Sequence, residues 1–194
     1  MDPFKLIEKH INTDNNLIQS IDEINRAIEH IVQQLSDAYM LYENNSFSSS
    51  VFMSITACEE VAKAHLGSFT DGTTAKGKPK NIFRDHKTKH ILSALPTVPM
   101  GSRLEKAIGK AELTKMMNMA HNSGFAQLRE SALYFQREKD TLVVPSDKID
   151  KKTARSILLF ALEIFDDALV GVTTYSMEID KKTDSMFNKL ANGE

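Results

Sequence analysis

The segment from Arg84 to His90 reads Arg-Asp-His-Lys-Thr-Lys-His, so it gathers side chains that can carry protons and hold phosphates. Histidine changes its charge near neutral pH and can act as a general acid or base. RNA cleavage requires such a base for the 2′-hydroxyl proton, and it requires cations such as Arg and Lys to stabilise the pentavalent phosphate. The candidate catalytic residues are Arg84, His86 and His90, and the candidate phosphate ligands are Lys87 and Lys89. The alternative is a solvated basic helix end.

His86 and His90 are four residues apart and would share one helix face, which is a spacing that metal ligands use. No Glu-x-x-His pattern or cysteine partner accompanies them. The chain also lacks a Walker loop, a Gly-x-Gly-x-x-Gly motif, a Cys-x-x-Cys motif and a nucleophile elbow. We therefore expect no metal and no cofactor.

A second charged group, Glu59-Glu60-x-x-Lys63, lies in a stretch rich in Ala, Val and Ile. Glu59 and Lys63 are four residues apart and can pair on one helix face, whereas Glu60 points about 100° away. The surrounding residues are apolar or small on nearly every side, which indicates a largely buried helix whose charges must be paired or functional. Two interpretations stay open: a structural ion pair, or a site in which Glu60 and Lys63 take part in catalysis.

A third group contains Arg129, which precedes the aromatic pair Tyr134-Phe135 in a moderately apolar segment. Arg129 can pair with a carboxylate of the second helix or point at a ligand. We treat Arg129 and Tyr134 as candidate ligands for RNA or phosphate, and a structural bridge is the alternative.

The elements that must position these groups are helical. Apolar residues recur every three or four positions from Leu17 to Leu41, which predicts a long amphipathic helix with Asp14 as its N-cap. Similar patterns, bounded by Gly, Pro and polar residues, predict further helices at about 47–66, 83–95, 102–122 and 146 or 150 to 190. Residues 126–136 are expected to be helical or turn-like.

Two shorter features complete the expected organisation. Residues 141–145 are predicted to be extended, and Gly171 marks a kink or a close contact inside the long last helix. The fold class is therefore all-α: a bundle of four to five main helices with long first and last helices. We expect a single helical domain over residues 1–194, with its core at about 14–190 and a loop at about 67–81.

Composition excludes several classes of protein. Hydrophobic residues make up 41% and charged residues 26%, as in an ordinary globular protein. Cys58 is the one cysteine, so no intramolecular disulfide forms and a reducing compartment is expected. Because there is no run of about 18 apolar residues and no signal-peptide core, we expect a cytoplasmic protein with no membrane partner.

The net charge of −2 hides an asymmetry along the chain. Residues 63–115 carry eleven Lys or Arg against four Asp or Glu, and the remainder carries thirteen against twenty-two. A basic central segment in an otherwise acidic chain can bind a phosphate-rich partner. The alternative is that the lysines belong to a solvated loop.

Four stretches in order carry a family resemblance: Ser36 to Ser50, Cys58-Glu-Glu-Val-Ala-Lys63, Phe83-Arg-Asp-His-Lys-Thr-Lys89, and Leu128-Arg-Glu-Ser-Ala-Leu-Tyr134 before Val144-Pro145. Together they resemble the AbiV family of abortive-infection proteins, a branch of the HEPN superfamily, over roughly residues 35–169. The resemblance implies a bacterial phage-defence protein with a HEPN helical core that arrests growth or blocks translation in an infected cell.

Many HEPN relatives are metal-independent ribonucleases that work as homodimers, and their hallmark is Arg followed by four to six residues and His. Arg84 and His90 have this spacing here. The resemblance therefore implies a homodimer that acts on RNA, with a phage or host protein as a further possible partner. We expect the three charged groups to meet in the folded core as one polar site. The alternative is a non-catalytic protein-interaction or nucleotide-binding module in which the cluster is structural.

Overall fold

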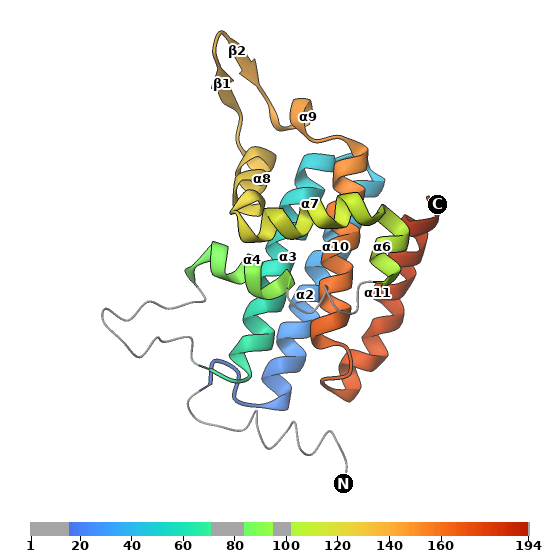
Figure 1. The fold of residues 1–194 in the computed structure, drawn as a ribbon. Helices are drawn as coiled ribbons and strands as arrows, with labels where there is room; N and C mark the ends of the chain where they lie inside the picture. The colour runs from blue at the N-terminus through green and yellow to red at the C-terminus, as the bar shows by residue number, and fades with distance from the viewer. Residues whose placement is uncertain (1–15, 71–83, 95–101, 194) are drawn as a thin grey trace, which may run out of the picture.

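The computed structural model describes residues 16–70, 84–94 and 102–193, and most of them are helical (Figure 1). Helices α2 (Ile21–Glu43) and α3 (Phe47–Gly67) form one antiparallel hairpin, and α10 (Lys151–Leu169) and α11 (Thr174–Asn192) form another. α3 packs against both α2 and α10 and is the central helix of the bundle. The predicted all-α bundle with long helices near both ends is confirmed.

α3 is buried on most of its circumference because its residues are apolar or small. Val51, Ile55 and Val61 fill the space toward its neighbours, while Ala57 and Ala64 let other helices approach closely. α2 has a narrower apolar stripe and keeps a polar outer face, as expected for a helix at the edge of a bundle. The consequence is that a charged side chain on the buried faces of α3 needs a partner inside the protein.

Shorter helices cover the side of α3 that α2 and α10 leave open. α4 (His86–Ala94) and α8 (Gly124–Leu133) both pack on α3, and α7 (Lys110–His121) bridges them. α6 (Ser102–Ile108) lies instead against α10 and α11. These helices carry the charged segments of the sequence to the surface of the central helix.

A β-hairpin protrudes from the bundle after α8 (Figure 1). It pairs β1 (Gln136–Glu138) with β2 (Thr141–Val143), with Arg137 opposite Leu142. The short helix α9 (Pro145–Lys148) then leads into α10. The extended conformation predicted at 141–145 is confirmed for residues 141–143, whereas its partner strand was not predicted.

Two helix boundaries differ from the sequence-based expectations, and one expected loop is largely outside the described residues. Ser20 caps α2 by accepting a hydrogen bond from the Glu23 N–H, while Asp14, the expected cap, lies outside the described residues. The helix expected at 102–122 is interrupted at Gly109, which has φ of 84°. Most of the loop expected at about 67–81 also lies outside the described residues.

The expected single last helix is wrong, because the chain reverses between α10 and α11. Gly171 has φ of 86°, a left-handed conformation that favours glycine. Thr173 then caps α11: its hydroxyl accepts from the Ser176 N–H, and the Ser176 hydroxyl accepts from the Thr173 N–H. Gly171 therefore makes a turn, and this turn returns α11 along α10.

Candidate functional site

The carboxylate of Glu59 is the centre of a charged cluster on the buried helix α3. Its Oε2 accepts hydrogen bonds from His86 Nδ1 at 2.7 Å and from Lys89 Nζ at 2.8 Å. Its Oε1 accepts from His90 Nε2 at 2.9 Å and from Arg129 Nη1 at 3.0 Å. We call these five residues the Glu59 cluster.

Helix geometry explains why four donors reach one carboxylate. His86, Lys89 and His90 occupy the first, fourth and fifth positions of α4, so they share the face that packs on α3. Arg129 comes from α8, which packs on the same helix. One residue or more from each of the three charged groups therefore meets at Glu59, whereas Glu60, Lys63 and Tyr134 do not join them.

Burial and hydrogen bonding act in opposite directions on Glu59, of which only 3% is exposed. Burial alone raises the pKa of a carboxyl group, but the hydrogen bonds from His90, Lys89 and His86 outweigh it and lower the pKa of Glu59 to about 2. The carboxylate is therefore ionised at neutral pH. It carries one negative charge against the two permanent positive charges of Lys89 and Arg129, so the cluster has an excess of positive charge.

His86 is the most exposed member of the cluster, with 47% of its side chain exposed, against 22% for Arg129. An ionised carboxylate only accepts hydrogen bonds, so His86 must carry a proton on Nδ1. Arg129 Nη1 lies 3.3 Å from His86 Nδ1. Because both nitrogens donate to the Glu59 carboxylate, we interpret this contact as two neighbouring donors and not as a hydrogen bond between them. His86 Nε2 has no partner among the described residues.

His90 is fully buried and differs from His86 in what surrounds its second nitrogen. Nε2 donates to Glu59, and the ring packs edge-on against Phe125 with centroids 5.7 Å apart. Nδ1 is buried with no hydrogen-bond partner in the described part of the chain. Because a buried N–H without an acceptor is unfavourable, the geometry favours the neutral ring with its proton on Nε2. His90 therefore holds Glu59 in place, away from solvent.

Two of the residues predicted to be catalytic lie elsewhere on α3. Glu60 and Lys63 pair with each other at 3.2 Å, which corrects the expected pairing of Lys63 with Glu59. They line a depression on the α2 side together with His30. The reason is the 100° rotation per residue of a helix, which turns Glu60 away from α4 and α8.

The remaining predicted residues are exposed around the cluster. Arg84 and Lys87 face solvent at the start of α4, and neither forms an ion pair within the described residues. Tyr134 follows α8, is 65% exposed and leaves an aromatic ring open to solvent next to the exposed Phe135. Among the phosphate ligands predicted from the sequence, Lys89 and Arg129 contact Glu59, and Lys87 and Tyr134 do not.

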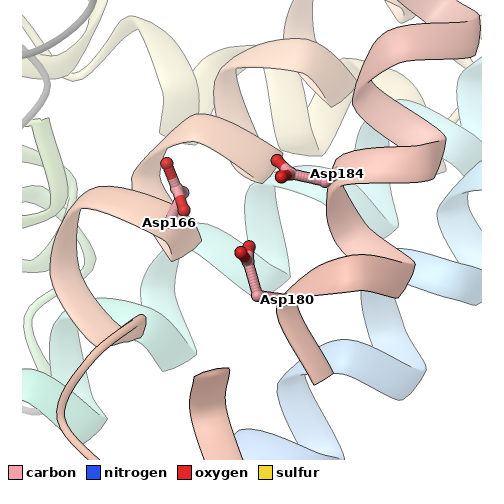
Figure 2. A group of neighbouring side chains, drawn as sticks. All are labelled: Asp166, Asp180 and Asp184. Atoms are coloured by element: carbon pink, nitrogen blue, oxygen red, sulfur yellow. The ribbon is translucent and has the colours of Figure 1, made fainter. Parts of the chain in front are cut away.

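A second charged cluster was missed in the sequence and is centred on Arg103 of α6. Its guanidinium donates to Glu163, to Asp166 at 3.0 Å and to Asp184 at 2.5 Å, and it lies 4.3 Å from the centre of the Phe187 ring. Asp166, Asp180 and Asp184 approach one another where α10 and α11 run side by side (Figure 2). The only sequence signal was acidic residues at helical spacings, which are common on exposed faces.

This second group, the Arg103 cluster, has an excess of negative charge. The oxygens of Asp166, Asp180 and Asp184 lie within 4.8 Å of one another, a spacing that suits a cation, and Arg103 contacts two of these three carboxylates. Burial, and then the Glu163 and Asp166 carboxylates, raise the pKa of the neighbouring Asp167 to about 6. The carboxylates are thus only partly neutralised by the single guanidinium.

Comparison with known families decides what kind of protein carries the Glu59 cluster. The model of the HEPN domain of AbiV matches residues 19–166, which is 148 of the 194 residues and includes all five members of the cluster. The chain belongs to the AbiV family. AbiV proteins are abortive-infection proteins of phage defence, so the family resemblance is confirmed. No curated protein and no solved structure matches the chain.

One further property concerns membranes. In the part of this AbiV protein that the structure describes, no helix combines the length and the apolar character that a membrane span requires.

Proposed function

We propose that this AbiV protein is a cytoplasmic abortive-infection effector that acts on RNA through the Glu59 cluster and thereby stops translation in an infected cell. The observation that carries the proposal is the convergence of His86, Lys89, His90 and Arg129 on one buried carboxylate, with His86 half exposed. An anionic ligand is the partner that such an excess of positive charge favours.

The proposed chemistry is metal-independent cleavage of the RNA backbone. His86 takes the proton of a 2′-hydroxyl on Nε2, and the 2′-oxygen attacks the adjacent phosphorus while the bond to the 5′-oxygen breaks. The leaving 5′-oxygen takes a proton from solvent, so the products are a 2′,3′-cyclic phosphate and a 5′-hydroxyl. Arg129 stabilises the charge on the phosphate, and Glu59 holds the imidazole in the tautomer that leaves Nε2 free.

A cleavage assay on single-stranded RNA in the presence of EDTA tests this proposal. We expect His86→Ala to lower the rate by about 100-fold or more, the range that a general base contributes. His121→Ala is the matched control, because His121 is an exposed histidine on α7 outside the cluster. Cleavage by folded His86→Ala at the rate of the wild type would falsify this role of His86, and products without a cyclic phosphate would exclude the proposed chemistry.

A second candidate function is protein binding without catalysis. The observation that favours it is the apolar surface around the hairpin, where Leu133, Tyr134, Phe135 and Leu142 are each about half or more exposed. In that case the Glu59 cluster fixes α4 and α8 on α3, and the hairpin binds a phage or host protein. Two variants together separate the functions: if the hairpin acts by binding a protein, the double substitution of Tyr134 and Phe135 by Ser abolishes phage resistance while His86→Ala leaves it intact, whereas RNA cleavage requires His86.

We also propose that the active form is a homodimer, as in many HEPN relatives. The same exposed apolar residues support this, because a two-fold interface buries a self-complementary patch. Light scattering at micromolar concentration should give a mass near twice 21.8 kDa. A mass near 21.8 kDa at that concentration would contradict the proposal.

A further inference from the structure

The outer face of the α2–α3 hairpin is hollowed at two places. One hollow, of about 260 Å³, is lined by the first half of α2, by the last turns of α3 and by residues 17–18. The other, of about 500 Å³, is lined by the last turns of α2, by Asn44 and by Met53 of α3. The linings contain no member of the Glu59 cluster or of the Arg103 cluster.

The two hollows lie along one line between the helices. Ala27 lines the first hollow and Leu41 the second, and Gln34 is seven residues from each, so the three share a face of α2. On α3, Met53 and Glu60 are also seven residues apart and line one hollow each. We call this face the α2–α3 groove. At 1.5 Å per residue it extends about 21 Å from Ala27 to Leu41.

The groove exposes apolar walls and contains an unpaired polar atom. Leu17 at one end is 43% exposed and Met40 at the other is 56% exposed, and Ala27 and Met53 between them are half-buried. On the same face of α2, Gln34 Oε1 is buried and has no hydrogen-bond partner in the described part of the chain. A buried acceptor without a donor is unfavourable. These features favour a further segment that covers the groove.

The chain itself approaches the groove at one end. The Leu17 N–H donates to the Thr70 carbonyl at 3.1 Å, and the Ile18 N–H donates to the Gly67 carbonyl at 2.8 Å, which fixes both residues beside the end of α3. Leu17 and Ile18 also line the first hollow. Residues 1–15, which lie outside the described residues, are therefore attached to the fold at the end of the groove.

The sequence of residues 3–11 predicts an amphipathic helix. Phe4, Ile7 and Ile11 are three and four residues apart, so they would share one face. Asp2 followed by Pro3 is a typical start, because Asp is a preferred N-cap and Pro is favoured at the first helical position. The next five residues, Asn-Thr-Asp-Asn-Asn, are polar, and a connection of this length is common between neighbouring helices.

We propose that residues 3–11 form a helix in the α2–α3 groove, antiparallel to α2, with Phe4, Ile7 and Ile11 against the groove. A helix of nine residues is about 13 Å long and fits within it. Glu8 follows Phe4 by four residues, so it lies at the edge of the same face, where it complements the charge of the partly exposed Lys63.

Covalent attachment favours this segment over a second copy of the chain. A short connection at the end of the groove gives the segment a high effective concentration, which a separate molecule lacks. The groove and the Glu59 cluster share no residue, so the proposal stands whether or not the cluster cleaves RNA. The bound segment would complete the cover of α3, the helix that carries Glu59.

Amide hydrogen exchange of the full chain tests the proposal. An isolated helix of this length is marginal in water, so exchange in residues 3–11 is slow only if the segment docks. We expect it to be at least about 10-fold slower in the wild type than in Ile7→Asp/Ile11→Asp. Leu6→Asp/His10→Asp is the matched control, because these residues lie off the apolar face, and it should exchange as the wild type does.

A variant of the groove tests the docking surface from the other side. Ala27→Lys places a charge on the half-buried groove wall and should speed exchange in residues 3–11 by at least about 10-fold. Gln33→Lys, at an exposed position of the same helix outside the lining of both hollows, is the matched control and should leave the exchange unchanged. Circular dichroism of each variant verifies that the helices are intact.

Four results would overturn the proposal. The first is exchange in the wild type as fast as in Ile7→Asp/Ile11→Asp, which would show that the segment does not dock. The second is an equal gain in exchange in Leu6→Asp/His10→Asp, which would exclude the apolar face as its cause. The third is exchange that Ala27→Lys leaves slow, which would place the segment elsewhere. The fourth is protection that is lost on dilution, which would assign the groove to a second copy.

Discussion

The Glu59 cluster and the Arg103 cluster are opposite in charge and in burial. In the Glu59 cluster, four donors surround one buried carboxylate. In the Arg103 cluster, three carboxylates surround one guanidinium, and the Arg103 side chain is 34% exposed. The first has excess positive charge and a half-exposed histidine, which suits an anionic ligand. The second fastens α6 to α10 and α11. Both clusters hold helices together, but of the two only the Glu59 cluster combines an excess of cations with a titratable group at the surface.

The largest expected effect on stability comes from removing the centre of the first cluster. Glu59→Gln leaves Lys89 buried without its anion, and we expect a loss of about 3 kcal/mol in the free energy of unfolding. Urea unfolding at pH 7 measures it. Glu60→Gln is the matched control on the same helix, and because its pair with Lys63 is partly exposed the loss should stay below about 0.5 kcal/mol. Equal losses in the two variants would show that burial does not distinguish the two carboxylates.

The same substitution has a pH dependence whose sign follows from the lowered pKa of Glu59. The carboxyl has an ordinary pKa of 4.5 and a pKa of about 2 in the folded protein, so its contribution is complete above about pH 5 and is lost as the pH falls toward 2. The difference in stability between the wild type and Glu59→Gln should therefore shrink between about pH 5 and pH 2. A constant difference over this range would contradict the assignment of Glu59 as the ionised centre.

A smaller effect is expected at the centre of the second cluster. Arg103→Met should lower the free energy of unfolding by about 2 kcal/mol at pH 7, because Glu163 is buried and loses its partner. The loss should be smaller at pH 5, since burial raises the pKa of Glu163 and of Asp166 and the freed carboxyl groups can take up protons. Lys106→Met, at an exposed position of the same helix, serves as the control in thermal unfolding. An Arg103→Met loss that grows on acidification would contradict this explanation.

The smallest expected effect is a gain at Asp167 beside the Arg103 cluster. Its pKa of about 6, raised from 3.8, means that the folded state holds a proton that the unfolded state has lost, so this group destabilises the fold as the pH rises through 6. Asp167→Asn should be more stable than the wild type by about 1 kcal/mol at pH 8, after allowing for its partial exposure, and the gain should vanish near pH 4. Asp140→Asn in the hairpin turn is the control. A gain that persists at pH 4 would contradict burial and carboxylate repulsion as its cause.

Much of the bundle could be predicted from local sequence. The run of small and apolar residues ending at Gly67 predicted α3 within one residue, and the spacing of His86 and His90 predicted a shared helix face. The choice between Glu59 and Glu60 could not be made, because adjacent residues differ by 100° in direction and only the packing of α4 and α8 decides which is buried.

The Arg103 cluster escaped prediction for a different reason, which is the chain reversal at Gly171. With one continuous last helix, Asp184 would lie far along the axis from Asp166, at about 1.5 Å per residue. The left-handed turn at Gly171 and the capping of α11 by Thr173 bring Asp184 back beside α10. The break at Gly109 between α6 and α7 was not predicted either, so the sequence did not indicate that α6 lies against α10 and α11.

The functional role of the Glu59 cluster is tested most directly by phage plating on cells that express the wild type or His86→Ala. His86 is half exposed, so its removal should change the free energy of unfolding by less than about 1 kcal/mol, unlike the removal of Glu59. We expect His86→Ala to be folded, to lose growth arrest and to raise the plating efficiency by at least about 100-fold, while His121→Ala restricts phage normally. If His86→Ala is folded and restricts phage as the wild type does, a functional role of the Glu59 cluster is contradicted. The cluster would then serve only to hold α4 and α8 on α3.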